Sequence, residues 1–144
     1  MASERQVHNS VSSWWGEHIH RYNEAIKSIE KNHIVLNLAC GTGYGTKLVA
    51  PHCSKVIGGD ISEETVAFNK ENYSGPGIDF QLLDGTSLSF EDNYFDTIIS
   101  FETIEHTTKF DEMLSEFKRV LKPTGKAFIS TTNIVVNSPT GENS

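Results

Sequence analysis

Residues 35–46 read VLNLACGTGYGT, an apolar run that breaks into three glycines, each separated from the next by one residue. A continuous apolar run is typical of a buried strand. Glycine has no side chain, so a loop rich in glycine turns tightly and brings its backbone close to a ligand. The stretch therefore predicts a strand followed by a loop that binds a nucleotide-like ligand.

Strand-like and helix-like segments alternate along the chain around this loop. The longer helix-like segments have apolar residues at spacings of three and four, and Pro51 is expected to end the short one after the glycines. Strands are predicted at residues 33–39, 55–60, 78–84, 96–101 and 126–132, and helices at residues 11–31, 45–49, 62–73 and 110–121. This alternation favours the α/β class: a Rossmann-like, doubly wound parallel sheet of about five strands with helices on both faces.

Length and composition favour one packed domain that spans residues 1–144. The chain has 144 residues, of which 37% are hydrophobic and 22% charged, enough for one core. A helical region at residues 1–32 precedes the first strand, and an irregular tail at residues 133–144 follows the last. No apolar run approaches the roughly 20 residues of a membrane-spanning helix, and the first residues lack a secretory signal, so we expect a cytoplasmic location and no membrane partner.

Charge and cysteine content narrow the range of ligands. The formal net charge is −7, so the phosphates of a nucleic acid would be repelled, which makes nucleic acid an unfavourable partner. The two cysteines are Cys40 and Cys53, and their spacing fits neither a zinc site nor a disulfide framework. A small molecule is therefore the favoured kind of ligand.

Polar residues follow several of the predicted strands at their carboxyl ends. In a doubly wound sheet, ligands bind in the crevice beyond these ends, where the glycine loop, Asp60 and Asp84 should meet. The dinucleotide fingerprint G-x-G-x-x-G would need glycine in place of Thr46, and a phosphate-binding P-loop would need a lysine after the last glycine. Neither fits, so the loop predicts a different nucleotide-like cofactor.

Four segments carry a resemblance to a known family: VLNLACGTGYG, VIGGDIS, QLLDGTSLSFEDNYFDTIISFETIEH and RVLKPTGKAFIST, in this order. Together they resemble the class I S-adenosylmethionine-dependent methyltransferases, in the broad subgroup that includes ubiquinone and sugar methyltransferases. The resemblance covers about residues 15–132. It implies S-adenosylmethionine as the cofactor and a small molecule as the methyl acceptor.

The resemblance also implies which residues hold the cofactor. Gly41 and Gly43 would let the loop pass close to its methionine part, and Asp60 would bind both ribose hydroxyls. Ile61 would pack on the adenine, and Asp84 would accept a hydrogen bond from the adenine amino group. The full set is Asn37, Ala39, Cys40, Gly41, Thr42, Gly43, Asp60, Ile61, Asp84, Gly85, Thr86, Ser100 and Phe101.

Some of these positions carry a second interpretation or a departure from the family. Asp60 is also placed to cap the helix predicted at residues 62–73. Asn37 stands where the family usually has an acidic residue, so it brings no charge opposite the ammonium and sulfonium groups of the cofactor. A lower cofactor affinity is expected for that reason. Ser100 and Phe101 would line the methionine side of the pocket.

Catalysis is expected to rest mainly on alignment of the acceptor, since the sulfonium already activates the methyl group. For a hydroxyl acceptor, His106 is the candidate general base, because imidazole titrates near the working pH. The alternative is that His106 caps the helix that follows it. Glu102, Glu105 and His106 also match the E-x-x-E-H metal motif of small-RNA 2′-O-methyltransferases, but no histidine follows His106 and the chain is acidic. No metal is therefore predicted.

The carboxyl-terminal part leads to a rival interpretation. Members of the family normally add two strands after the fifth, and no segment for them follows residues 126–132. The sheet is therefore expected to end there, with an open backbone edge for a second copy or a partner, or for the tail to fold back over. The rival to an enzyme is a non-catalytic S-adenosylmethionine-binding or interaction module that needs a partner.

Overall fold

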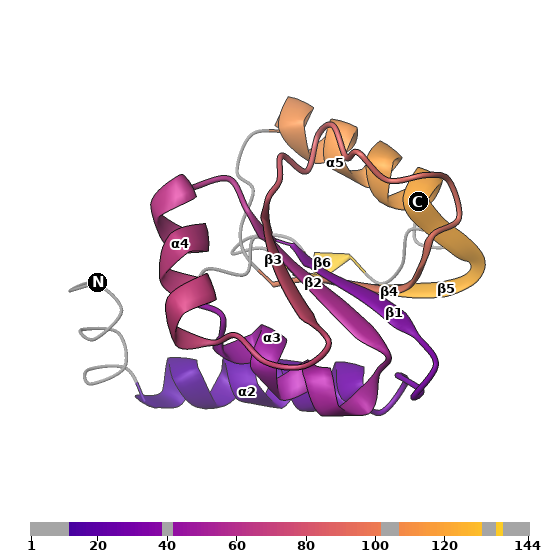
Figure 1. Ribbon diagram of the computed structural model, residues 1–144. Helices are drawn as coiled ribbons and strands as arrows, with labels where there is room; N and C mark the ends of the chain where they lie inside the picture. Colours follow the sequence, from indigo (N-terminus) through magenta and orange to yellow (C-terminus); the bar gives the residue numbers. More distant parts are fainter. Residues whose placement is uncertain (1–11, 39–41, 102–106, 131–134, 137–144) are drawn as a thin grey trace.

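The computed structural model describes residues 12–38, 42–101, 107–130 and 135–136. In these residues one sheet runs in the order β3-β2-β1-β4-β5-β6 (Figure 1). Its strands are β1 (Ile34–Leu38), β2 (Lys55–Asp60), β3 (Ile78–Leu82), β4 (Phe95–Ser100), β5 (Leu121–Ser130) and β6 (Val135–Val136). The helices are α2 (Ser12–Ile26), α3 (Tyr44–Val49), the short 3-10 helix η1 (Ala50–His52), α4 (Glu63–Asn72) and α5 (Thr107–Val120). Strands β1 to β5 pair in parallel, which confirms the predicted α/β fold class.

Helices cover both faces of the sheet, with α5 on one side and α2 and α3 on the other (Figure 1). Successive residues of the central strands point to opposite faces. Leu36 of β1 belongs to the core that includes Phe117 of α5, whereas Val35 belongs to the core that includes Tyr22 of α2. The continuous apolar run that starts at Val35 is thus explained by a strand buried on both sides.

The order of the strands reverses between β1 and β4. The chain moves outward from β1 to β2 and β3, then returns to β4 on the other side of β1 and continues to β5. Asn37 marks this point, because it lies beside Gly58 of β2 and Ile99 of β4. Ligands of doubly wound sheets bind beyond the carboxyl ends of the strands at such a reversal.

Most predicted boundaries agree with the structure to within three residues, and two differ by more. The strand expected at residues 126–132 begins at Leu121, which pairs with Phe95 before the register shifts to Lys126 opposite Thr97. Gly125 lies in this irregular stretch, where an added Cβ would come within 2.8 Å of the Asp96 carbonyl oxygen. The helix expected at residues 11–31 ends at Ile26.

The tail contains a strand that the sequence pattern did not indicate. Val135 and Val136 form β6, which pairs antiparallel with Ser130 and Ile129 of β5. Residues 133–144 are therefore not irregular throughout, and the carboxyl end of β5 is covered by the tail. Helix α3 ends at Val49, as predicted, and Pro51 lies in η1, the short 3-10 helix that follows it. None of the helices in the described part is long and apolar enough to cross a membrane.

Candidate functional site

Asp60 ends β2 at the carboxyl edge of the sheet, and its side chain shapes the turn into α4. Its Oδ1 accepts a hydrogen bond of 3.1 Å from the backbone N–H of Ser62. Ser62 caps the helix, because its Oγ accepts a hydrogen bond of 3.2 Å from the backbone N–H of Thr65. The interpretation of Asp60 as the helix cap is therefore wrong. Its carboxylate fixes the position of the cap residue instead.

Asp84 follows β3, the strand next to β2. Its Oδ1 accepts hydrogen bonds from both the backbone N–H of Thr86 at 3.0 Å and the Thr86 hydroxyl at 2.7 Å. These two hydrogen bonds hold the pKa of Asp84 below its usual value, and the bond from the backbone N–H has the larger effect. Oδ2 of this exposed carboxylate forms no hydrogen bond with another described residue. At neutral pH it is an ionised acceptor open to a ligand.

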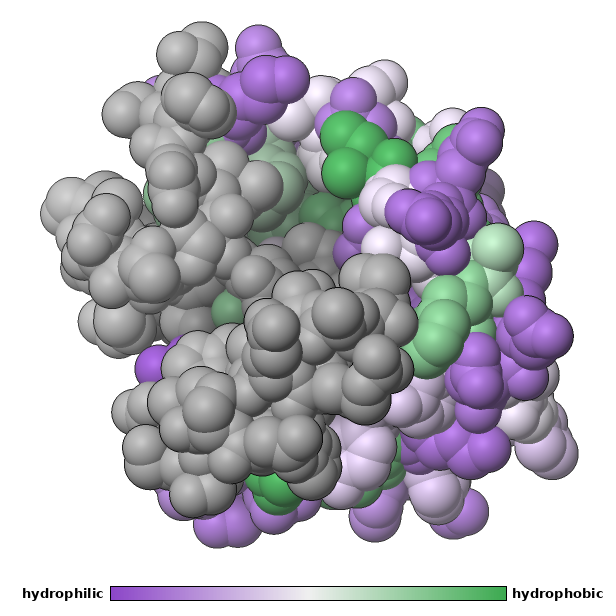
Figure 2. All heavy atoms as spheres, turned by 90° about the vertical axis from the view of Figure 1, so that its left-hand side faces the viewer, coloured by the Kyte–Doolittle hydropathy of each residue, from purple (hydrophilic) through white to green (hydrophobic). Residues whose placement is uncertain are grey.

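Two aliphatic side chains are exposed beside these carboxylates. Ile61 follows Asp60 and is 70% exposed, and Leu82, which pairs with Asp60 across the sheet, is 50% exposed. Figure 2 looks onto this edge of the molecule and shows hydrophobic residues in the depth of a hollow. An apolar ring that covers such side chains gains about 25 cal/mol for each Å² removed from water. The edge thus offers apolar surface next to hydrogen-bond acceptors.

Asn37 is fully buried and joins β1 to two helices. Its Nδ2 donates to Thr46 Oγ1 at 2.9 Å and to the Tyr22 hydroxyl at 3.1 Å. The Tyr22 ring packs edge-to-face on Phe101 with 5.0 Å between ring centroids, and a Cβ at Gly45 would come within 2.1 Å of its Cζ. The third glycine of the loop therefore makes room for Tyr22. Sequence reasoning did not assign Tyr22 or Thr46 to this arrangement.

Gly43 is buried, and its missing side chain makes room for the protein itself. A Cβ there would come within 2.7 Å of Phe80 Cζ and 3.1 Å of Tyr73 Cβ. Its backbone N–H donates to Oδ1 of the buried Asn69 at 2.8 Å. Packing on Phe80 is therefore one reason for this glycine, and its expected role in making room for the cofactor stays a prediction. Thr42 beside it is half-buried.

Gly85 lies tightly against neighbouring side chains, and the residues at the end of β4 are buried. A Cβ at Gly85 would come within 2.7 Å of both Leu38 Cδ2 and Met113 Cγ, so the loop after β3 lies close against α5. Ser100 is fully buried, and its Oγ has no hydrogen-bond partner among the residues that the structure describes, whereas Phe101 is 8% exposed. Both side chains are thus buried at the carboxyl end of β4, and their expected place beside the methionine part of the cofactor stays a prediction.

The remaining candidates lie outside the described residues. They are Ala39, Cys40 and Gly41 of the glycine loop, and His106 with Glu102 and Glu105 of the E-x-x-E-H match. Within the part of the chain that the structure describes, no three His, Cys, Asp or Glu side chains gather in a way that could hold a metal ion.

A depression of about 440 Å³ lies at the opposite, amino-terminal edge of the sheet. Lys31 and Lys47 line it, and each donates to a backbone carbonyl oxygen, of Pro51 at 3.1 Å and of Ser74 at 3.2 Å. Cys53 also lines it, and burial raises the pKa of this thiol, which keeps it protonated. Because ligands of this fold bind at the carboxyl ends, we place the candidate site at the other edge.

Comparison with known families identifies the class of domain. Residues 36–129 match a family model described as a methyltransferase domain. The match covers more than half of the chain, so the chain belongs to this methyltransferase family. The described fold, with its strand reversal beside β1 and two carboxylates at the ends of β2 and β3, agrees with that assignment.

Several individual proteins are similar to this chain. A Mycolicibacterium smegmatis protein named "Probable S-adenosylmethionine-dependent methyltransferase" is 37% identical over 73% of this chain and 40% of its own length. The ubiquinone/menaquinone biosynthesis C-methyltransferase UbiE of Hydrogenovibrio crunogenus is 31% identical over 76% of the chain and 46% of its own. A ubiquinone biosynthesis O-methyltransferase of Coxiella burnetii is 32% identical over 85% and 58%.

A solved structure, the PH0226 protein of Pyrococcus horikoshii, superposes with a TM-score of 0.73 at 31% identity, over 86% of this chain and 60% of that one. The chain spans about two fifths to three fifths of the length of the relatives named above. These findings confirm the predicted class, an S-adenosylmethionine-dependent methyltransferase domain with a Rossmann-like fold, and its cofactor.

Proposed function

We propose that this chain binds S-adenosylmethionine at the carboxyl edge of its sheet and transfers the methyl group to a small-molecule acceptor. The observation that carries the proposal is the placement of Asp60 at the end of β2 and of Asp84 just after the adjacent strand β3, beside the strand reversal. The family of the domain supports the same conclusion.

The residues at this edge fit the adenosine part of the cofactor. Asp60 would accept hydrogen bonds from the ribose hydroxyls while its Oδ1 holds the N–H of Ser62. The open Oδ2 of Asp84 would accept a hydrogen bond from the adenine amino group. Ile61 and Leu82, both exposed, would be covered by the adenine ring. Each group supplies what the nucleoside needs: acceptors at its edge and apolar contact on its face.

The methionine part of the cofactor would find no charged partner at position 37. Asn37 is neutral and turned toward Thr46 and Tyr22, so position 37 provides no carboxylate for the ammonium group. S-adenosylmethionine supplies a methyl group that its sulfonium already activates. The chain has to align an acceptor with this methyl group, and alignment alone lowers a barrier by about 7 to 11 kcal/mol. His106 is the proposed base for a hydroxyl acceptor.

The acceptor atom is a separate question. Relatives of similar identity are named as a C-methyltransferase and an O-methyltransferase, and they match 76% and 85% of this chain, so the matched segments overlap. The segment they share therefore serves the cofactor and allows different acceptors. A small-molecule acceptor is the proposal consistent with both names and with the net charge of −7.

Cofactor binding is tested by titration calorimetry on Asp60→Ala. Loss of the ribose contacts should weaken S-adenosylmethionine binding by about 1.5 to 3 kcal/mol, the range for hydrogen bonds to a charged group. Asp79→Ala is the matched control, because this β3 carboxylate bonds Gln81 and lies away from the carboxyl edge. Unchanged affinity in a folded Asp60→Ala protein would remove Asp60 from the site.

Methyl transfer is tested with labelled cofactor and a panel of hydroxyl, amine and carboxyl acceptors. With a hydroxyl acceptor, His106→Gln should lower the rate about 100-fold while cofactor binding stays intact, because the base is lost. Full activity in this variant would leave alignment as the whole mechanism. Tight cofactor binding without transfer to any acceptor would favour the non-catalytic module. Transfer that stops when a chelator is added would favour the metal-dependent RNA methyltransferase.

A further inference from the structure

Residues 83–94 connect β3 to β4 without a helix or strand of their own. Because β2 and β1 lie between these two strands in the sheet, the connection crosses both of them on its way. Its first residues include Asp84, Gly85 and Thr86, the proposed adenine side of the cofactor site. An irregular segment of this kind needs partners for its backbone groups, since it forms no ladder or helical bonds.

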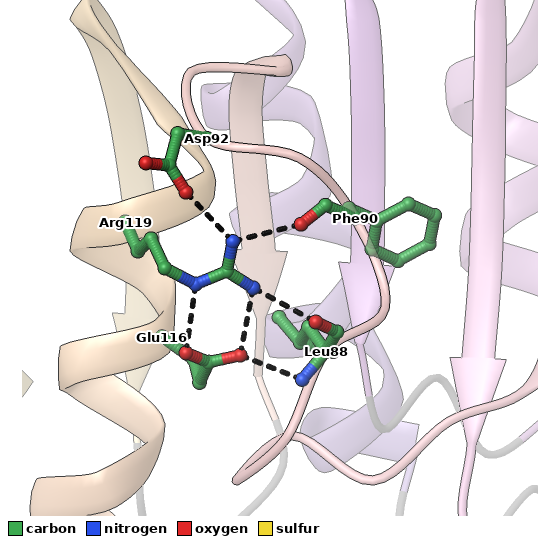
Figure 3. Close-up of polar contacts among 5 residues, drawn as sticks. All are labelled: Leu88, Phe90, Asp92, Glu116 and Arg119. Carbon is green, nitrogen blue, oxygen red and sulfur yellow. Dashed lines mark hydrogen bonds and ion pairs between the residues drawn. The ribbon is translucent and has the colours of Figure 1, made fainter.

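Helix α5 contacts the connection through three side chains spaced about one turn apart, and two of them bond its backbone. Met113 packs where Gly85 has no side chain. Glu116 Oε1 accepts a hydrogen bond of 2.7 Å from the backbone N–H of Leu88. Arg119 donates at 2.8 Å to the backbone carbonyl oxygens of Leu88 and Phe90 (Figure 3). One face of α5 therefore holds the connection from residue 85 to residue 90.

Arg119 uses all five of its N–H donors in this arrangement (Figure 3). Its Nε and Nη2 donate to the two oxygens of Glu116, both at 2.9 Å. Nη1 donates to Asp92 Oδ1 and to Phe90 O, both at 2.8 Å, and Nη2 also donates to Leu88 O. The planar guanidinium matches this geometry, whereas a lysine ammonium has three donors and no fork. The contact is therefore specific for arginine.

We infer that Arg119, together with Glu116, is a positioning residue for cofactor binding. It fixes the backbone at residues 88–90 and the side chain of Asp92 on α5, and so sets where Asp84 and Thr86 lie at the exposed edge. The inference rests on the proposed function, because it concerns the adenine side of that site. Arg119 itself touches the connection and not the cofactor, so its effect on affinity passes through Asp84.

The experiment compares Arg119→Lys and Glu116→Gln with wild type, at a temperature where denaturation shows all three to be folded. In Arg119→Lys, the dissociation constant for S-adenosylmethionine should rise about tenfold, since part of a charged hydrogen bond is lost when Asp84 is less well placed. Hydrogen exchange of the Ser87 and Leu88 amides should become faster in the ligand-free protein. Lys122→Ala is the control, because it breaks an ion pair with Asp96 away from this connection.

Thr86→Val separates positioning from general stability. It removes the hydroxyl that bonds Asp84, so the carboxylate is already loosened before Arg119 is changed. In this background Arg119→Lys should change the dissociation constant much less than in wild type. Fully additive effects would assign Arg119 to stability alone.

Two other results would overturn the inference. An unchanged dissociation constant in Arg119→Lys, with a wild type that binds, overturns the positioning role and leaves the proposed function standing. A wild type that does not bind S-adenosylmethionine overturns both, and the amide exchange then shows only whether Arg119 holds the connection.

Discussion

Glycines of the same loop are required by different neighbouring side chains, and only the structure shows which side chain lies against each one. The spacing of the glycines predicted a loop that approaches a ligand. Gly43 and Gly45 in fact lie against the rings of Phe80 and Tyr22. A spacing pattern cannot show which distant aromatic side chain fills the space beside a glycine. Asp60 and Asp84 were easier to predict, because their places at strand ends follow from the local sequence alone.

The Tyr22 hydroxyl should stabilise the fold through Asn37. Tyr22→Phe leaves the ring against Gly45 and Phe101 but removes a hydrogen-bond partner from the fully buried Asn37 amide. We expect the free energy of unfolding to fall by about 1 to 3 kcal/mol, the cost of an unsatisfied buried polar group. Urea denaturation measures it. Tyr94→Phe is the control, because no described residue bonds the Tyr94 hydroxyl, and it should change stability by less than about 0.5 kcal/mol. Equal stability of both variants would contradict the role of Tyr22.

Elements whose boundaries depend on nearby residues were predicted well. β2 has the predicted bounds, because the run at residues 55–60 begins after the polar Ser54 and ends with the polar Asp60. The start of β5 was missed, because it depends on the pairing of Leu121 with Phe95, a contact between distant parts of the chain. Helix α5 was expected from its apolar stripe, which includes Met113 and Phe117. The polar stripe of Glu116 and Arg119 on the same helix gave no comparable signal, since its partners are backbone groups of a loop.

The contact of Glu116 on α5 with Arg119 and the loop at Leu88 should stabilise the protein less at acidic pH. The hydrogen bonds from Arg119 are the main reason that the pKa of Glu116 lies below its usual value. A carboxyl whose pKa is lowered by folding stabilises the protein above its unfolded pKa, near 4.3, and this stabilisation is lost as the pH falls through the folded pKa. The difference in unfolding free energy between wild type and Glu116→Gln should therefore be largest near neutral pH and shrink below about pH 4.

Urea denaturation at neutral and acidic pH measures this difference. Glu112→Gln on the exposed side of α5 is the control and should follow wild type at both values. A difference for Glu116→Gln that stays constant with pH would show that the contact with Arg119 does not depend on the charge of the carboxylate.

At the scale of the whole molecule, the strand order places the candidate site, and the tail determines whether the β5 edge of the sheet is paired. The parallel order and the reversal between β1 and β4 place the strand ends of β2 and β3 together, which the alternation of segments in the sequence allowed us to expect. That the tail folds back over β5 was one of the predicted alternatives, but β6 itself was not predicted, because a two-residue strand has too few residues to show a pattern. Because of β6, the β5 edge is not open along its whole length but is paired at Ile129 and Ser130.

We propose that β6 protects the β5 edge from self-association. Unpaired strand edges recruit other chains, and Lys126 is the only charged residue in the second half of β5 to discourage this. The double variant Val135→Pro with Val136→Pro removes two backbone donors from β6 and should release it from Ile129 and Ser130. Sedimentation velocity across a concentration series should then show a monomeric wild type and a variant that associates as its concentration rises. Val135→Ala with Val136→Ala keeps the donors and should remain monomeric. A proline variant that stays monomeric and folded would mean that the β5 edge attracts no second copy, and a wild type that already associates would mean that β6 does not protect it.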